Sequence, residues 1–167
     1  MIQPQTALRE ITLEDADFMA QLVSNPAVIQ YLPGLIDDKD ALAKWIMGLD
    51  ASDHEYMITL ADDRTRIGEC SLMVQGDSAE IGLMIMPEYW RQGYGMEVIA
   101  QLTAFAENLH VTKLTATTAR ENKAAIGLLE KCGFNRQTQG WMVMITPEEP
   151  EDKIPKGLAI LQFLKKV

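Results

Sequence analysis

Three apolar-rich stretches follow one another near the middle of the chain, and turn-forming residues separate them at 62–65 and 75–78. Runs of this length between turn residues are typical of β-strands. Such short connections favour hairpins between antiparallel neighbours. The pattern therefore predicts an antiparallel meander with strands at 56–60, 67–74 and 81–86.

The third of these strands is apolar on both faces. Ile81, Leu83 and Ile85 alternate with positions that include Met84 and Met86, so the two sets point to opposite sides of the sheet. A strand of this kind is predicted to lie centrally in a sheet that is covered on both faces.

The first part of the chain predicts a strand followed by helices. An opening strand at 8–11 precedes a helix that begins after Thr12, with Asp15 three residues on as an approximate capping box. Apolar residues at helical spacing continue this helix until Pro26 breaks it. A short second helix is then predicted to run to Tyr31.

A third helix is predicted immediately before the meander, over 41–49, with Asp37 or Asp38 as its cap. The elements after the meander are helices at 93–109 and 122–132, a β-branched strand at 111–117, and closing strands at 141–145 and 158–164 around an acidic loop at 146–155. A strand–helix–strand unit crosses over to a parallel neighbour, so the predicted sheet is mixed.

The composition fits one soluble domain spanning residues 1–167. Apolar residues make up 47% of the chain and charged residues 23%, the balance of a globular protein with a core. No apolar run is long enough to cross a bilayer, and the N-terminus lacks a secretory leader pattern. Cys70 and Cys132 lack CxxC spacing, so neither a disulfide scaffold nor a zinc site is predicted, and a cytoplasmic location is expected.

The chain is acidic, with a formal net charge of −9. Binding to a nucleic-acid backbone depends on Lys and Arg residues that neutralise phosphates, so no direct nucleic-acid partner is expected. An acidic surface attracts a cationic small molecule or peptide end. Solubility alone explains the same charge.

A glycine-rich turn joins the central strand to the longest predicted helix, in the run Trp90-Arg91-Gln92-Gly93-Tyr94-Gly95. The first N–H groups of a helix have no partner inside the helix, and the helix dipole adds positive charge there. The turn is therefore predicted to bind an anion, most often a phosphate. The alternative is a tight turn that needs glycine only for its positive φ. No P-loop Lys-Ser/Thr follows, which disfavours a nucleotide-binding domain.

Three features together resemble the GNAT superfamily of acetyl-CoA-dependent N-acetyltransferases. They are the order of elements, the turn, and the run that starts at Asn122 and ends in Glu130-Lys131-Cys132-Gly133-Phe134. Ala79-Glu80-Ile81-Gly82 followed by Pro87-Glu88-Tyr89-Trp90 resembles the RimJ/RimL-like branch, which acetylates the N-termini of ribosomal proteins. The resemblance implies an α/β (α+β) fold in one domain, with a mixed, mostly antiparallel sheet of about seven strands flanked by about four helices.

The resemblance also implies that acetyl-CoA is the acetyl donor and that no metal takes part. Its pyrophosphate is expected on backbone N–H groups of the turn, and its pantetheine arm in a gap that a bulge opens between the central strand and the next parallel strand. Trp90 stands where the family pattern has Gln or Arg, a departure expected in the RimJ/RimL-like branch. The residues expected to bind acetyl-CoA are Met84, Ile85, Met86, Arg91, Gln92, Gly93, Tyr94, Gly95, Met96 and Asn122.

The implied reaction is direct attack of an amine on the acetyl thioester, after the amine has lost a proton. Glu80 is the candidate base, acting directly or through water, and Glu69 is the second choice. A solvated or structural glutamate is the alternative for Glu80. Asn122 is expected to bond the pantetheine arm, to cap its helix, or both. A backbone N–H at Ile85 or Met86 is expected to stabilise the oxyanion.

Two positions depart from the family pattern. Many relatives have a tyrosine where this chain has Leu129, and RimJ/RimL-like enzymes often have a serine where it has Ala125. Neither side chain can protonate the leaving thiolate, which keeps a non-catalytic acyl-CoA-binding regulator as a second hypothesis.

The acceptor is expected to be a peptide N-terminus, with a polyamine or aminoglycoside-like small amine as the alternative. Segments 31–44 and 146–155 are expected to border it. No membrane partner is expected, and a monomer and a homodimer paired through the last strands fit equally well.

Overall fold

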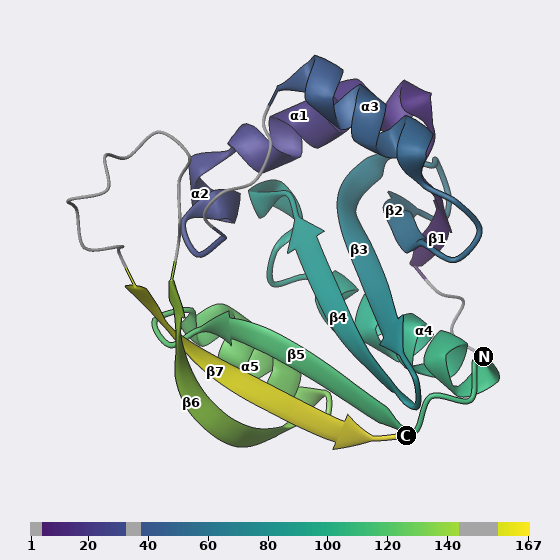
Figure 1. Ribbon diagram of the computed structural model, residues 1–167. Helices are drawn as coiled ribbons and strands as arrows, with labels where there is room; N and C mark the ends of the chain where they lie inside the picture. The colour runs from purple at the N-terminus through teal and green to yellow at the C-terminus, as the bar shows by residue number, and fades with distance from the viewer. Residues whose placement is uncertain (1–4, 33–37, 144–156) are drawn as a thin grey trace.

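A computed structural model describes residues 5–32, 38–143 and 157–167 of the protein. Figure 1 labels the elements in chain order. They are β1 (Thr6–Glu10), a 3₁₀ turn η1 (Leu13–Asp15), α1 (Ala16–Ser24), α2 (Pro26–Ile29), α3 (Lys39–Gly48), β2 (His54–Leu60), β3 (Arg66–Gln75), β4 (Ser78–Ile85), a second 3₁₀ turn η2 (Pro87–Tyr89), α4 (Tyr94–Asn108), β5 (Lys113–Ala119), α5 (Lys123–Lys131), β6 (Asn135–Val143) and β7 (Gly157–Lys166).

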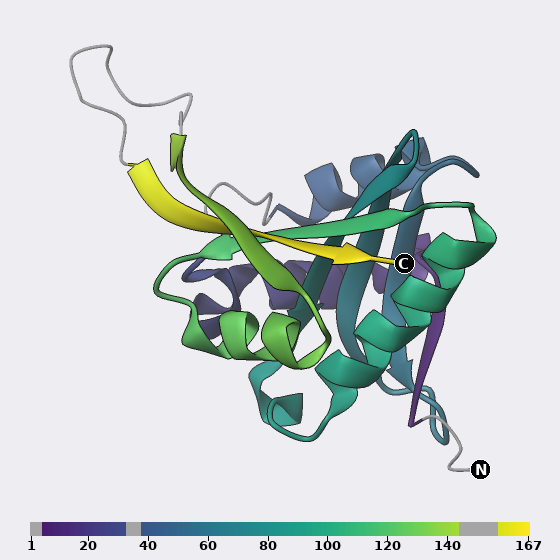
Figure 2. The ribbon, with the colours of Figure 1, turned by 90° about the horizontal axis from the view of Figure 1, so that it is seen from below.

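One mixed sheet of seven strands forms the centre of the molecule, in the order β1-β2-β3-β4-β5-β7-β6. Only β4 and β5 are parallel neighbours in this sheet, and the other pairs are antiparallel. The predicted meander and the mixed, mostly antiparallel sheet are confirmed. Helices α1, α2 and α3 lie on one face, and α4 and α5 lie on the other (Figures 1 and 2).

The two faces of β4 contribute to two separate cores, as its pattern predicted. Ile81, Leu83 and Ile85 pack on the side of α4 and α5, whereas Met84 and Met86 pack against the core under α1 and α3. The central position of β4 in the sheet is therefore confirmed.

The described part of the chain has five α-helices, consistent with the expectation of about four, and the predicted short second helix is α2. Pro26 stands in its first turn, and the Asn25 side chain accepts a hydrogen bond from the Ala27 N–H at 3.0 Å. This helix ends at Ile29, before the predicted Tyr31. Of the two expected caps for α3, Asp38 is the cap, accepting from the Ala41 N–H at 2.8 Å.

Element boundaries shift where tertiary pairing overrides the local pattern. Strand β5 begins at Lys113, two residues after its predicted start, because the N–H of Val111 donates to the Ala106 carbonyl at the end of α4. The predicted strand at 141–145 begins earlier, as β6 at Asn135, through pairing with β7. The acidic loop at 146–155 lies outside the described residues.

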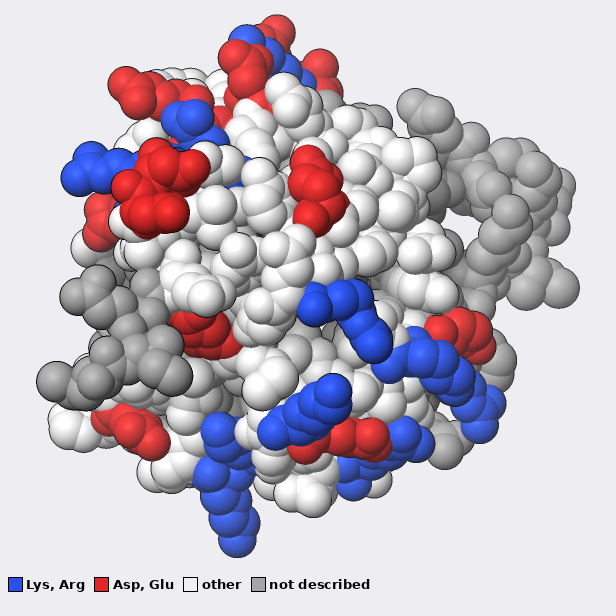
Figure 3. Space-filling view, turned by 180° about the vertical axis from the view of Figure 1, so that it is seen from behind, with Lys and Arg blue, Asp and Glu red and all other residues white. Residues whose placement is uncertain are grey.

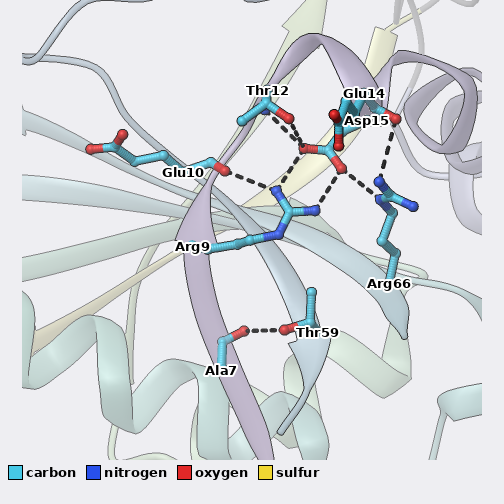
Figure 4. A network of polar contacts seen from close by, with 8 residues as sticks. All are labelled: Ala7, Arg9, Glu10, Thr12, Glu14, Asp15, Thr59 and Arg66. Carbon is cyan, nitrogen blue, oxygen red and sulfur yellow. Dashed lines mark hydrogen bonds and ion pairs between the residues drawn. The ribbon is translucent and has the colours of Figure 1, made fainter. Parts of the chain in front are cut away.

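Asp15 ties the α1 layer to the sheet through an ionic network (Figure 4). Its buried carboxylate accepts hydrogen bonds from Arg9 of β1 at 2.6 and 2.7 Å and from Arg66 of β3 at 2.6 Å. It also accepts from the Thr12 N–H at 2.8 Å, so the predicted capping interaction is present. The helical layer is thereby fixed to two strands.

Candidate functional site

The parallel strands β4 and β5 pair over only part of their length. Residues 78–80 of β4 pair with 113–115 of β5, and beyond Glu80 the two strands spread apart (Figure 1). The register between β3 and β4 continues without a shift along all of β4. The opening in the sheet therefore begins where the β4–β5 ladder ends, and the bulge expected in β4 is not found in this register.

Backbone groups of alternate β4 residues face this opening. The Met86 N–H donates to a carbonyl of β3 at 2.8 Å, and the Ala79 carbonyl accepts from a β5 hydroxyl at 3.3 Å. Hydrogen-bonding direction alternates along a strand, so Ile81, Leu83 and Ile85 direct their N–H and carbonyl groups toward the opening. Of the two oxyanion donors expected, Ile85 is on the correct side and Met86 is already bonded to β3.

The turn before α4 has a backbone suited to an anion. Arg91 and Gly93 have φ values of 62° and 94°, and Gly93 is the N-cap of α4. Left-handed residues in such a turn direct successive N–H groups into one concavity. Tyr94 and Gly95 supply the first N–H groups of the helix. The Met96 N–H donates instead to the Gly93 carbonyl at 3.1 Å.

The two glycines of the turn serve different purposes. Gly93 needs its left-handed φ, and an added Cβ there would meet no atom within 4 Å. A Cβ on Gly95 would stand 3.0 Å from Leu128 Cδ2 and 3.8 Å from Leu83 Cδ2. Gly95 therefore allows α4 to begin close to α5 and β4, and Figure 2 shows α4 and α5 side by side.

Trp90 has a structural reason for its place in the turn. Its indole N–H donates to the Ile85 carbonyl at 2.6 Å, at the end of β4 where no strand pairs on that side. The Gln92 side chain makes a second bond inside the turn, to the Glu88 carbonyl at 2.7 Å. The Trp90 contact holds the turn against the end of β4, and the Gln92 contact stabilises the turn itself.

Asn122 is the N-cap of α5. Its side-chain oxygen accepts from the Ala125 N–H at 3.1 Å, so the expected capping role is present. Leu129 is 6% exposed and belongs to the core under α4 and α5, and Ala125 is half-buried. The two positions that depart from the family pattern are therefore part of the packing of α5.

Glu80 lies at the last pair of the β4–β5 ladder, opposite Thr115, and is half-buried. It occupies the narrow end of the opening, whereas the turn occupies the end near Ile85. Because β4 residues alternate between faces, Glu80 lies on the same face as Met84, the side of α1–α3. The two sequence candidates, Glu80 and the turn, thus lie at opposite ends of one opening.

A buried carboxyl pair lies on the same face. Glu69 of β3 is only 5% exposed and is hydrogen-bonded to the half-buried Glu55 of β2. Burial, aided by this contact, raises the pKa of Glu69 well above its usual range, and burial also raises the pKa of Glu55. A hydrogen bond between two carboxyl groups requires one shared proton. Glu69 was the second candidate from the sequence, but its partner was missed.

Several basic side chains lie on the face that carries α4 and α5, although the chain is acidic. Figure 3 shows Lys and Arg side chains over the lower half of this face, with some Asp and Glu side chains among them. Arg91 belongs to the turn itself and is exposed, whereas Arg136 is paired with Glu130 at 2.8 Å. The charge of Arg91 favours an anionic ligand at the turn.

Metal sites and membrane spans are two other possibilities for the part of the chain that the structure describes. These residues contain no group of three or more His, Cys, Asp or Glu side chains that could hold a metal ion. Within the same ranges, no helix has the length and apolar character needed to cross a membrane.

Comparison with known proteins agrees with this geometry. Residues 5–135 match the model of a family described as an acetyltransferase (GNAT) domain. The chain is 28% identical over 142 residues to the uncharacterized N-acetyltransferase YoaA of Bacillus subtilis, covering 78% of this chain and 79% of that protein.

Solved structures share the fold. A protein of Vibrio cholerae assigned as a ribosomal-protein-serine acetyltransferase superposes with a TM-score of 0.76 at 21% identity, over 99% of this chain and 96% of that one. The spermidine N-acetyltransferase of Vibrio cholerae, in complex with CoA and spermine, superposes with a TM-score of 0.75 at 22% identity, over 98% and 96%.

Proposed function

The chain belongs to the GNAT family of acetyltransferases, and we propose that it transfers the acetyl group of acetyl-CoA to a peptide N-terminal amine. The observation that carries this proposal is the opening between β4 and β5, which has an anion-binding turn at one end and Glu80 at the other. A ligand with a phosphate end, a long polar arm and a reactive tip suits that arrangement.

The residues present fit acetyl-CoA. Tyr94 and Gly95 offer helix N–H groups to the pyrophosphate, and Arg91 adds positive charge beside them. Leu83 and Ile85 offer backbone groups along the opening to the amide groups of the pantetheine arm. At 3.3 Å per residue, β4 from Met86 back to Glu80 spans about 20 Å, a length suited to that arm.

The sequence also named other residues for acetyl-CoA binding, and the direction of their backbone and side-chain groups decides how each can contribute. Met84 and Met86 direct their own backbone groups away from the opening. We therefore propose that their neighbours Leu83 and Ile85, and not these two residues, make the backbone contacts to the pantetheine arm. Gln92 contributes by holding the turn, and Met96 by closing the first turn of α4. Asn122 is proposed to bond the pantetheine arm through the part of its amide that does not cap α5.

The chemistry requires an unprotonated amine and a donor for the oxyanion. A backbone N–H facing the opening, from Leu83 or Ile85, is proposed to bond the carbonyl oxygen as negative charge develops on it. Glu80, at the narrow end, is the proton acceptor proposed from the sequence, acting directly or through water. Glu80→Gln tests that role through kcat at constant acetyl-CoA affinity.

Two observations bear on the acceptor. The run from Ala79 to Trp90 resembles the RimJ/RimL-like branch, and one structural neighbour is assigned as a ribosomal-protein-serine acetyltransferase. These favour a peptide N-terminus. A polyamine is the second candidate, because another neighbour was solved with CoA and spermine and the net charge of −9 attracts a polycation.

The test is an acceptor panel with acetyl-CoA, read by release of the CoA thiol. The panel holds peptides that differ in their first residue, their N-acetylated counterparts, spermidine, spermine and an aminoglycoside. We expect turnover with unblocked peptides and none with the blocked ones. Turnover with polyamines alone would move the proposal to the second acceptor class. CoA binding by calorimetry without turnover on any amine would favour an acyl-CoA-binding regulator.

A further inference from the structure

A row of small and polar residues crosses the sheet at the level of the opening. On the α1–α3 face, Glu55 of β2 lies directly opposite Ser71 of β3, and Ser71 lies directly opposite Gly82 of β4. Glu69 is two residues from Ser71 along β3 and therefore lies on the same face. Its own cross-strand neighbours on this face, Met57 and Met84, are apolar. The row thus places a carboxyl pair beside a hydroxyl that leads toward β4.

Ser71 reaches over the strand that borders the opening. Gly82 has no side chain, and a Cβ built there would overlap Ser71 Oγ. The hydroxyl, which belongs to a side chain only 8% exposed, therefore occupies the space above Gly82. The β4–β5 ladder has already ended at Glu80, so no paired strand separates this hydroxyl from the opening.

We propose that the Glu55–Glu69 pair, reached through the Ser71 hydroxyl, takes the place of Glu80 and accepts the proton that the amine loses before it attacks the thioester. This inference rests on the acetyl transfer proposed above. The ammonium N–H donates to Ser71 Oγ, and the Ser71 O–H proton passes to Glu55, whose Cβ lies about 5 Å across the strand pair. The neutral amine then forms the C–N bond as the C–S bond breaks. Its second proton goes to the departing thiolate.

The chemistry favours a carboxyl group of this kind over an ordinary one. A peptide N-terminal ammonium has a pKa near 8 and a solvated glutamate near 4, so proton transfer between them is uphill. A base works best when its pKa lies near the operating pH. Burial raises the pKa of Glu55, which receives the proton, and burial of Glu69 favours the shared proton on Glu69. A pair that already shares one proton can take the second without leaving an isolated buried charge.

The charged surroundings of the pair are few. Asp53 lies near Glu55 and raises its pKa further, and the Cys70 thiol lies close enough to interact with both carboxyl groups. From β4, Glu80 is on the same face. The charged residues of α1 and α3 in the described ranges are all exposed at the surface, namely Asp17, Lys39, Asp40 and Lys44. No basic residue is among the groups that shift the pKa of Glu69.

The experiment compares kcat, KM and their pH dependence between pH 6 and 10 for the wild type, Glu69→Gln, Ser71→Ala and Glu107→Gln, using the best acceptor from the panel. Glu107 is an exposed carboxylate of α4 and provides the matched control. Thermal unfolding and CoA affinity are measured for each variant, so that a folding defect is separated from a chemical one.

We expect Glu69→Gln to lower kcat about 100-fold or more, with unchanged CoA affinity. The ionisation that limits kcat at low pH should shift, because Glu55 keeps its carboxyl group but loses the partner with which it shares a proton. Ser71→Ala should lower kcat and keep that ionisation, since the pair is intact. Glu107→Gln should match the wild type. Wild-type kcat and pH dependence in both Glu69→Gln and Ser71→Ala would overturn the inference while leaving the acetyltransferase proposal intact. An inactive wild type that binds CoA would overturn both.

Discussion

Asp15→Asn is expected to weaken the attachment of the α1 layer to the sheet. The Asp15 carboxylate is fully buried and accepts hydrogen bonds from Arg9, Arg66 and Thr12 at 2.6–2.8 Å. An asparagine keeps the shape but loses the charge. Its NH₂ group also faces guanidinium groups, which have no acceptor. The substitution therefore removes two ion pairs and adds a donor–donor contact.

The size of the loss follows from the exposure of the partners. Breaking a buried ion pair costs about 3–5 kcal/mol when the remaining charge stays buried and unpaired. The Arg9 and Arg66 side chains are 39% and 36% exposed, so each guanidinium can be hydrated in the variant. The expected loss in the free energy of unfolding is therefore smaller, about 2–3 kcal/mol. For a chain of this length the unfolding midpoint drops by about 5–10 °C.

The pH dependence gives the sharper test. The partners of Asp15 hold its pKa well below the usual range, and desolvation opposes them. A depressed folded-state pKa stabilises the protein above the unfolded pKa near 4, and the stabilisation is lost as pH falls below that value. The difference between wild type and Asp15→Asn should therefore be full at pH 7 and shrink below about pH 4.

Chemical unfolding in urea at pH values from 3 to 7 measures this difference. Asp17→Asn is the control, because Asp17 pairs with Lys39 at 2.5 Å but both side chains are exposed, 70% and 58%. Its midpoint should match the wild type, since exposed pairs contribute little whatever their distance. Equal losses in the two variants, or a loss for Asp15→Asn that stays constant down to pH 3, would refute the reasoning.

Three further predictions concern the turn, α5 and the cysteines. Gly93→Ala strains a left-handed residue by about 1–2 kcal/mol and should weaken CoA binding about 5- to 30-fold in calorimetry, with wild-type affinity as the contrary result. Asn122→Ala should cost about 1 kcal/mol of stability by removing the cap of α5; Asn122→Ser should restore stability without restoring CoA affinity, and restoration of both would limit Asn122 to capping. Burial raises the pKa of the Cys70 thiol, so iodoacetamide should label half-buried Cys132 first, as mass spectrometry of the native protein would show.

Local patterns predicted the elements wherever the pattern was long and its partners were close in sequence. The meander and α4 were found because their apolar periods are regular and their connections short. Strand β5 was displaced because Val111, although β-branched, is bonded to the end of α4. The insertion of β7 between β5 and β6 depends on long-range pairing, which periodicity does not encode.

The parts of the site that depend on local sequence could be predicted, whereas the parts that depend on strand register could not. The turn could be predicted from Gly93 and Gly95, because glycines just before a helix indicate a backbone that adopts positive φ or approaches another group closely. The link between Glu55 and Glu69 required the register between β2 and β3, and a shift of one residue would have placed them on opposite faces. Asp15 was recognised as a capping residue, whereas its partner Arg66 is 51 residues away in sequence.

The proton count of the proposed reaction bears on the two positions that depart from the family pattern. An ammonium that becomes an amide loses two protons, and the thiolate that leaves takes one. If the Glu55–Glu69 pair receives the first proton, the second is available to the thiolate at the moment the C–S bond breaks. A separate acid is then unnecessary, so Leu129 in the core and Ala125 on α5 are compatible with turnover. Catalysis by the chain then depends on β2 and β3, whereas the tyrosine or serine of many relatives corresponds to positions on α5, which packs against β5.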